Sequence, residues 1–341
     1  MKCLKAGADI KESRKSRQAR RGSSGQQGSC PGHMKTKSET VFAEEMYCGA
    51  FSVNAVFLMK DKENGIEKDI ENSRMEKRME KAVLFFDIDG TLLSEVTKEI
   101  PDSAVEALRR AKDAGHLLFI NTGRTVCSIP AEIRRLPFDG YLCGCGTCIV
   151  YHDEILFQRS LSRERGRAVI EKMFECSLGG VAEGPEDVYF PERISRFDKL
   201  ETTRRYFRAK GMGIECSMER GDFIYDKLFI YADGKSDLGS FLAFIDEDME
   251  AMDRGGNAYE VIQKGYSKAT ACEFIVEKLG FTKDQAYVFG DSSNDLAMFE
   301  YADHAVAMGE HAEVLEPYTE YVTKTVEEDG IFHAMRHYGL I

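Results

Sequence analysis

The strongest constraint on the fold is a regular alternation of short apolar runs and amphipathic segments that begins near residue 81. The run AVLFFD (82–87) is continuously apolar until its last residue, which is typical of a strand buried on both faces of a parallel sheet. A predicted helix at 101–115 starts at a proline and an aspartate and stops at a glycine. The run HLLFIN (116–121) predicts a second buried strand.

The alternation continues after these elements. We expect Val105, Leu108 and Ala111 of the first helix to face the core. A short helix near 127–135, a strand at 140–144 and a hairpin at 148–161 follow. Strands that alternate with helices through short links indicate right-handed βαβ units, so the sequence predicts an α/β protein with a Rossmann-like parallel sheet.

A different pattern interrupts this domain. Between 162 and 257 we predict an α+β insertion with helices at 166–176, 197–210 and 236–252 and strands at 187–190, 213–218 and 225–231. The first pattern then returns with helices at 267–280 and 293–301 and strands at 286–291 and 304–308. The predicted domains are therefore one α/β domain made of 81–161 and 258–341, and an inserted domain at 162–257.

The first 80 residues differ in composition from the rest of the chain. Residues 1–37 contain ten Lys or Arg and two Asp or Glu, whereas the whole chain has a formal net charge of −12. We expect residues 1–80 to be a disordered extension, and we hypothesise that the working protein starts at Met75 or Met79. A nucleic-acid-binding arm is the weaker alternative, because the acidic balance argues against nucleic acid as a partner.

Composition narrows the class of protein further. The chain has no apolar run of about 18 residues, the minimum for a membrane span, so we expect no membrane association. Its start lacks the apolar segment of a secretory signal. Ten scattered cysteines without a disulfide rhythm favour reduced thiols and a cytoplasmic location.

Polar side chains follow the predicted strands at the points where they end. Asp87 and Asp89 follow the first strand, Asn121 and Thr122 end the second, and a later strand ends at Asp291 and is followed by Asn294 and Asp295. Lys268 opens the helix before that later strand. Because parallel strands deliver their carboxyl ends to one sheet edge, we expect these groups to share a crevice.

This set of groups indicates phosphoryl transfer. Four close carboxylates repel one another unless a cation lies among them, and ligands that are all oxygen favour Mg²⁺. Thr122 and Lys268 offer donors for phosphate oxygens, and one carboxylate is placed to attack phosphorus.

Four motifs in this chain resemble those of the haloacid dehalogenase-like phosphatases. They are DIDGT (87–91), NTGR (121–124), SK (267–268) and GDSSND (290–295), in the order that this family has, and the resemblance covers 81–341. The position of the insertion resembles a C2-type cap domain. The stretches GYSKATA and GDSSNDLAMF are similar to the Cof-type branch.

The resemblance implies a role for each matching residue. Asp87 is the nucleophile that forms an aspartyl-phosphate, and Asp89 protonates the leaving alcohol and then activates water. Thr122, Gly123, Lys268 and Asn294 bind the phosphate, with Gly123 there for backbone shape. The Mg²⁺ ligands are Asp87, the Asp89 backbone carbonyl and Asp291, with Asp295 in support.

Several residues have structural alternatives. Asp89 could cap a turn, Asp295 could satisfy backbone amides at a helix start, and Lys268 could be a solvated helix residue. Arg124 is open between a substrate contact and a structural salt bridge.

The cysteines in CGCGTC (143–148) have two interpretations. Cys145 stands where relatives often carry an asparagine, which puts a polar substrate contact there in doubt. Cys143, Cys145 and Cys148 suggest zinc, but packing within strands is the favoured alternative.

The inserted domain is expected to choose the substrate. Its stretches 182–190, 195–207 and 225–231 supply aromatic and charged residues. Arg204 and Arg205 are open between binding a second anionic group and forming a solvated helix face, and the latter is favoured.

The sequence thus predicts a monomeric or homodimeric Mg²⁺-dependent phosphatase of small phosphorylated metabolites, with sugar phosphates preferred, acting through an aspartyl-phosphate. The alternative is a non-enzymatic sensor of phosphate or of phosphorylated metabolites.

Overall fold

The computed structural model describes residues 81–341. The expectations about residues 1–80, including a start at Met75 or Met79, lie outside the described residues. Within residues 81–341 the chain forms one eight-stranded sheet and one five-stranded sheet.

The eight-stranded sheet belongs to the domain that we call the core. Its strand order is β13-β12-β11-β1-β2-β3-β4-β5, parallel from β13 to β3 and antiparallel in the last two pairings. The strands are β1 (Val83–Phe86), β2 (Leu117–Asn121), β3 (Gly140–Cys143), β4 (Cys148–Tyr151), β5 (Glu154–Gln158), β11 (Ala286–Gly290), β12 (His304–Ala307) and β13 (Tyr321–Val322). The helices are α2 (Asp102–Asp113), α3 (Ala131–Arg134), α7 (Lys268–Leu279), α8 (Leu296–Tyr301) and α9 (Gly330–His337).

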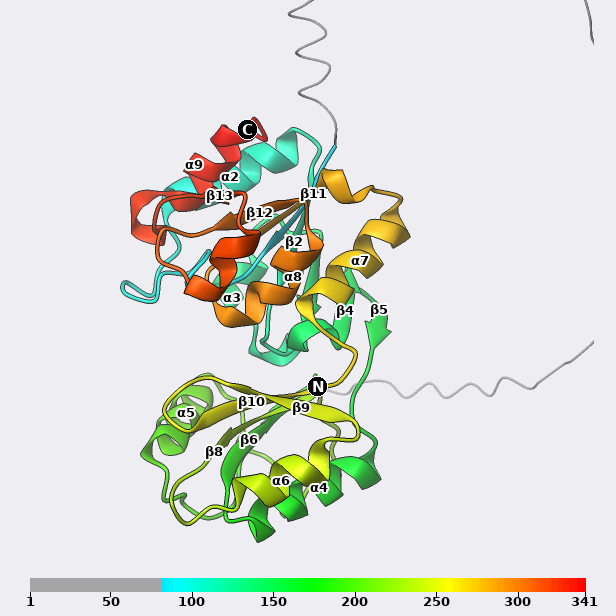
Figure 1. The fold of residues 1–341 in the computed structure, drawn as a ribbon, viewed down its shortest axis with the longest axis vertical. Helices are drawn as coiled ribbons and strands as arrows, with labels where there is room; N and C mark the ends of the chain where they lie inside the picture. Colours follow the sequence, from blue (N-terminus) through cyan, green and yellow to red (C-terminus); the bar gives the residue numbers. More distant parts are fainter. Residues whose placement is uncertain (1–80) are drawn as a thin grey trace, which may run out of the picture. The chain divides into compact units, whose positions relative to one another are not determined.

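Strand β1 is apolar throughout because it is covered on both faces. Leu84 and Phe86 belong to an apolar cluster that includes residues of α2 and α9, and Val83 and Phe85 belong to a second cluster with residues of α7 and α8. Figure 1 shows these two pairs of helices around the sheet. Alternation along the strand thus places its residues in two separate cores.

The predicted core face of α2 needs one correction. The helix buries Ala104, Ala107, Leu108 and Ala111, whereas Val105 is 36% exposed. The buried residues follow the i, i+3, i+4, i+7 spacing of one helix face, and Val105 lies off this stripe.

The inserted domain, which we call the cap, is built on the five-stranded sheet in the order β7-β6-β8-β10-β9. Helices α4 and α6 contribute to one apolar cluster with the sheet, and α5 contributes to another. The elements are α4 (Arg163–Glu175), β6 (Gly179–Glu183), β7 (Val188–Tyr189), α5 (Asp198–Ala209), β8 (Lys227–Tyr231), α6 (Leu238–Ile245), β9 (Met249–Asp253) and β10 (Ala258–Gln263). The expected α/β core with an inserted α+β cap is therefore confirmed.

Three details of the cap differ from the sequence-based expectation. Residues 213–218 form no strand and contribute only an isolated bridge from Ser217 to Phe190. The helix expected at 236–252 ends at Ile245 and is followed by β9. The five-stranded sheet continues to Gln263, past the expected boundary at 257, and it includes β6, which the sequence reading missed.

The missed strand β6 has the sequence GGVAE, which has low intrinsic strand propensity. Its glycines are required by packing, since a Cβ on Gly179 would lie 2.4 Å from the Phe197 ring and one on Gly180 would lie 2.9 Å from Met173 Sδ. Tertiary packing therefore overrides local preference here. None of the helices described in residues 81–341 is long and apolar enough to cross a bilayer.

Candidate active site

The site begins at the carboxyl end of β1. Asp87 follows the strand and is 5% exposed. The chain then turns through Gly90, whose φ is 81° and whose hypothetical Cβ would lie 2.3 Å from Asp291 Oδ2. A glycine is needed for this turn, because only an absent side chain lets the first motif approach Asp291.

Lys268 connects two of the carboxylates. Its Nζ donates to Asp87 Oδ1 at 2.7 Å and to Asp295 Oδ1 at 2.5 Å, and the residue is 1% exposed. Burial alone would lower the pKa of Lys268, but Asp295 and Asp87 raise it above its ordinary value, so the ammonium keeps its charge. Asn121 Nδ2 donates to the Lys268 carbonyl oxygen at 2.9 Å and so positions the start of α7. Lys268 is therefore not a solvated helix residue.

Asp295 has one of the roles considered for it and a second contact that the sequence did not predict. Its Oδ2 accepts the backbone N–H groups of Asp291 and Ser292 at 3.0 and 2.9 Å, as expected of a residue at a helix start. Its Oδ1 accepts from Lys268. Thr91 Oγ1 donates to Asp291 Oδ1 at 2.8 Å, so the first motif also orients Asp291.

Three carboxylates lie close enough together to hold a metal ion. Asp87, Asp291 and Asp295 each offer an oxygen, and these oxygens lie within 4.8 Å of one another. Burial is the main cause that raises the pKa of Asp87 to about 7 and that of Asp291 to about 8, and the neighbouring carboxylates add to it. A set of crowded, desolvated carboxylates fits a hard divalent cation, which would favour their charged forms.

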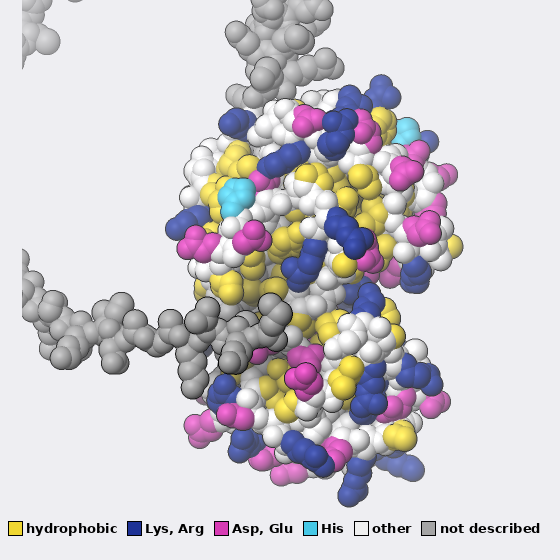
Figure 2. Space-filling view, turned by 180° about the vertical axis from the view of Figure 1, so that it is seen from behind, with side chains coloured by type: hydrophobic (Ala, Val, Ile, Leu, Met, Phe, Trp, Pro, Cys, Tyr) yellow, Lys and Arg dark blue, Asp and Glu magenta, His cyan; other side chains and the backbone are white. Residues whose placement is uncertain are grey.

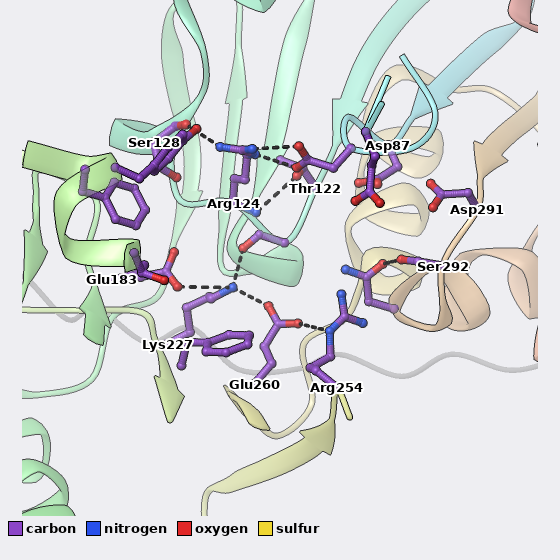
Figure 3. A pocket seen from close by; sticks show the side chains of 18 of the residues that line it. Asp87, Thr122, Arg124, Ser128, Glu183, Lys227, Arg254, Glu260, Asp291 and Ser292 are labelled. Atoms are coloured by element: carbon purple, nitrogen blue, oxygen red, sulfur yellow. Dashed lines mark hydrogen bonds and ion pairs between the residues drawn. The ribbon is translucent and has the colours of Figure 1, made fainter. Parts of the chain in front are cut away.

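The side chain of Asp89 lies outside this group. Arg124 Nε donates to Asp89 Oδ2 and Arg124 Nη2 donates to Asp89 Oδ1, both at 2.7 Å. The same guanidinium donates to the Ser128 carbonyl oxygen at 3.3 Å, and these contacts are drawn in Figure 3. Arg124 therefore forms a salt bridge, and its partner is the predicted acid and base.

The remaining predicted phosphate-binding residues lie beside the cluster. Thr122 is buried, and its Oγ1 accepts the backbone N–H of Arg124 at 3.2 Å. Asn294 Oδ1 accepts from Lys268 Nζ at 3.2 Å. Gly123 has no left-handed φ, but a Cβ there would lie 3.1 Å from Glu260 Oε1, so space rather than backbone conformation explains this glycine.

The three cysteines of the 143–148 segment occupy packing positions. Cys143 and Cys148 are opposite each other on β3 and β4, and both belong to an apolar cluster. Cys145 lies in the connecting turn with φ 55°, and its Sγ lies 3.9 Å from Glu260 Oε1. Burial raises the pKa of the Cys145 thiol to about 12, so the group is neutral and acts as a weak donor.

Residues of the core and the cap line an open cavity of about 540 Å³ at the site. Asp87, Asp89, Thr122, Arg124, Asp291 and Asn294 line it from the core. Each of the three cap stretches singled out in the sequence contributes to the lining, through Glu183, through Thr202, Thr203, Tyr206 and Phe207, and through Lys227 and Phe229.

Sequence reasoning missed several lining residues, among them Arg254 and Glu260, and it was wrong about Arg204. Arg254 and Glu260 line the cavity from β10 and the turn before it, and no motif marks them. Arg204 is buried rather than solvated, and it donates to the carbonyl oxygens of Pro191 and Arg193 instead of lining the cavity. The sequence did carry a signal for Lys227, because this lysine is the first residue of an otherwise apolar strand, KLFIY.

Comparison with protein families agrees with this geometry. The family model described as haloacid dehalogenase-like hydrolase matches residues 84–335, which is most of the chain. The chain belongs to this hydrolase family. Its expected membership among haloacid dehalogenase-like phosphatases is thereby confirmed.

Two curated relatives and one solved structure represent these similarities. The Bacillus subtilis protein named 5-amino-6-(5-phospho-D-ribitylamino)uracil phosphatase YcsE is 26% identical over 263 residues, which cover 76% of this chain and 96% of the relative. The phosphoglycolate phosphatase of Archaeoglobus fulgidus is 24% identical over 258 residues, covering 75% and 96%. The structure described as the subclass IIB sugar phosphatase BT4131 has a TM-score of 0.65 and 26% identity, covering 76% of this chain and all of that one.

Proposed function

We propose that this haloacid dehalogenase-like hydrolase is a Mg²⁺-dependent phosphatase of small phosphorylated metabolites, with sugar phosphates as the preferred class, and that it acts through an aspartyl-phosphate on Asp87. The observation that carries the proposal is the position of Asp87. This buried carboxylate lines the cavity, contacts Lys268 at 2.7 Å and lies within 4.8 Å of the ligand oxygens of Asp291 and Asp295.

In the proposed mechanism Asp87 is the nucleophile. Lys268 orients the Asp87 carboxylate and favours its charged form against the effect of burial, so its free oxygen can attack phosphorus. Thr122 and Asn294, which both line the cavity, donate to phosphoryl oxygens, with Gly123 leaving space for the loop. The P–O bond to the alcohol breaks as the Asp87–P bond forms.

Asp89 acts as the general acid in the first step and as the general base in the second. It protonates the leaving alcohol oxygen, and in the second step it removes a proton from the water that hydrolyses the aspartyl-phosphate. Both of its oxygens accept from Arg124 in this structure, so one must turn toward the leaving group before the transfer.

The metal fits the residues present. Asp87 and Asp291 would hold Mg²⁺ with the Asp89 backbone carbonyl, and Asp295 would support the site. When bound, Mg²⁺ neutralises charge on the transferred phosphoryl group.

Relatives support the substrate class. The curated activities named above are those of phosphatases, and the solved structure is described as a sugar phosphatase. The cytoplasmic location, the monomeric or homodimeric state and the absence of membrane and nucleic-acid partners remain predictions. No observation on residues 81–341 favours the sensor alternative, which predicts phosphate binding without turnover.

The test is hydrolysis of p-nitrophenyl phosphate by the full chain with Mg²⁺, with EDTA and in the Asp87→Asn variant. We expect Mg²⁺-dependent turnover that EDTA removes and that Asp87→Asn reduces to background. The matched control is Asp246→Asn, an exposed cap carboxylate that pairs with Lys264, and we expect it to retain activity. A folded protein that binds phosphate but turns over no phosphate ester would support the sensor alternative.

A further inference from the structure

The face of the cap sheet that borders the cavity carries charge, which is unusual for a buried sheet. Residues Glu183 on β6, Lys227 on β8 and Glu260 on β10 are each less than 10% exposed. Their neighbours Ala182, Leu228 and Val261 point to the other face, into the apolar cluster with α4 and α6. Alternation along three adjacent strands therefore places a charged layer against the cavity.

The three cations that line the cavity are all paired within the described residues. Arg124 is held by Asp89 through two hydrogen bonds. Lys227 Nζ forms an ion pair with Glu260 and donates to the Gly123 carbonyl oxygen at 2.8 Å. Arg254 has the loosest pairing, with its Nε 3.7 Å from Glu260 Oε2 and an Nη1 hydrogen bond to Ser293 Oγ at 3.2 Å.

Glu183 is different, because its carboxylate is only weakly paired. Its Oε1 lies 3.8 Å from Lys227 Nζ, and Figure 3 shows Lys227 between Glu183 and Glu260. Burial raises the pKa of the Glu183 carboxyl, and Lys227 lowers it. In its ionised form this carboxylate only accepts hydrogen bonds, and the molecule that fills the cavity can donate them. The aromatic side chain of Phe229 lines the same cavity and is on the same face of the sheet as Lys227, two residues away.

This arrangement discriminates between classes of leaving group. Hydroxyl groups donate to a carboxylate, and the apolar face of a polyol packs on an aromatic ring. A carboxylate or a second phosphate on the substrate would need a cation that is already paired with an acidic side chain, and it would lie close to Glu183.

We propose that Glu183 is a specificity-determining residue that accepts hydrogen bonds from the hydroxyl groups of an uncharged, polyhydroxylated leaving group, and that the cap disfavours phosphate esters carrying a second anionic group. This inference rests on the proposed phosphatase function and names its substrate class. It separates the chain from a relative named for phosphoglycolate, whose leaving group, glycolate, carries a carboxylate.

The test compares substrates that differ in one group. The full chain with Mg²⁺ at pH 8 is assayed on glucose 6-phosphate against 6-phosphogluconate, and on glycerol 3-phosphate against 3-phosphoglycerate. We expect kcat/KM to favour the uncharged member of each pair by at least about 10-fold.

Variants test the assignment to Glu183. Glu183→Gln keeps the volume and removes the charge. We expect this variant to lower the ratio of kcat/KM values between the uncharged and the carboxylated substrate at least about threefold. The matched control is Glu175→Gln, an exposed glutamate on cap helix α4, which should leave the preference as it is. If Glu183→Gln does not fold, the kcat/KM ratios of the wild-type protein for the two substrate pairs decide whether the cap disfavours a second anionic group.

Three results would overturn the inference. They are equal or better hydrolysis of the carboxylated substrates, a preference that Glu183→Gln does not change, and 6-phosphogluconate turnover that Arg254→Met selectively removes. Turnover of p-nitrophenyl phosphate without turnover of either polyol phosphate would also contradict it while leaving the phosphatase proposal intact. Failure on p-nitrophenyl phosphate as well would overturn both.

Discussion

At the scale of one residue, Asp89 shows that a sequence motif can predict which side chains are present without predicting what each of them contacts. The spacing DxDGT predicts two carboxylates at one site, but the structure places only Asp87 among the clustered acids. Asp89 is turned to Arg124, and its side chain is 40% exposed. The proposed acid and base therefore has room to move, whereas the proposed nucleophile is fixed.

Replacing Asp89 by Asn removes proton transfer and keeps the shape of the side chain. We expect kcat on a sugar phosphate to fall by about 10² to 10⁴, the usual contribution of general acid–base catalysis. The loss should be smaller for formation of the aspartyl-phosphate from p-nitrophenyl phosphate, because p-nitrophenolate leaves without protonation. Single-turnover kinetics would measure both losses, and an equal effect on the two substrates would argue against the role as acid.

A second residue, Asp226, is a buried titratable group that has no role in the proposed mechanism. It is fully buried at the start of β8, its Oδ1 accepts from Ser160 Oγ at 2.5 Å, and within the described residues its Oδ2 has no hydrogen-bond partner. Burial raises the pKa of Asp226 from 3.8 to about 6, against the opposing hydrogen bond from Ser160. The folded state therefore holds a proton here that the unfolded chain releases above pH 4.

Asp226→Asn should change how stability depends on pH. Because the folded pKa is raised, the wild type loses stability as pH rises from about 4 to about 6, and the loss is complete above that window. The Asn variant has no proton to lose, so its free energy of unfolding relative to wild type should rise over this window by up to about 3 kcal/mol. Urea unfolding at pH 4.5 and 7.5 checks this, and a difference that stays constant with pH would contradict the assignment.

At the scale of elements, β1 was predictable because a strand between two layers of helices must be apolar at every position. Its neighbours in the sheet are β11 and β2, paired in parallel from Val83 to Phe86. The strand β9 was not predictable, because MEAMD is compatible with a helix until β10 pairs with it.

Phe85 provides the test of this central strand. The residue is fully buried and its ring lies 5.7 Å from that of Phe119. We expect Phe85→Ala to lower the free energy of unfolding by about 3–5 kcal/mol, because it leaves a cavity in the core. Val105→Ala on the exposed side of α2 should change it by less than about 0.5 kcal/mol. Thermal unfolding of both variants gives the comparison, and similar melting temperatures would contradict the packing described here.

At the scale of the whole described molecule, Lys227 links the cap to the core. Its Nζ contacts Glu260 within the cap sheet and donates to the carbonyl oxygen of Gly123 in a core motif. Burial opposes its charge, but Glu183 and Glu260 raise the pKa of Lys227 above its ordinary value. The same ammonium thus pairs closely with Glu260, lies 3.8 Å from Glu183 Oε1 and holds the loop that carries Thr122.

Lys227→Met should therefore destabilise the protein strongly. Removing one partner of a buried ion pair leaves an uncompensated charge, with an expected cost of about 3–5 kcal/mol. The control is Lys172→Met, which removes a 3.4 Å ion pair with the exposed Glu175 and should cost less than about 1 kcal/mol. Calorimetric unfolding at pH 7 separates the two, and an unchanged transition in Lys227→Met would show that the buried cluster does not require its cation.

The sequence by itself determined the parallel core, the inserted domain and the residues that meet at the strand ends. These features follow from local patterns, because a buried strand must be apolar and a catalytic turn needs particular side chains at close spacing. The backbone then brings Asp87, Lys268, Asp291 and Asp295 together because parallel strands share one carboxyl edge.

Only the tertiary structure decided which partners each charge has. The pairing of Asp89 with Arg124, the burial of Arg204 and the charged layer of the cap sheet all depend on contacts between segments far apart in the chain. Burial and pairing set the energy of a charged side chain, and neither is encoded in its immediate neighbours along the sequence. For this reason the four motifs predicted which groups meet in the core, whereas they did not predict the charged cap residues that line the cavity.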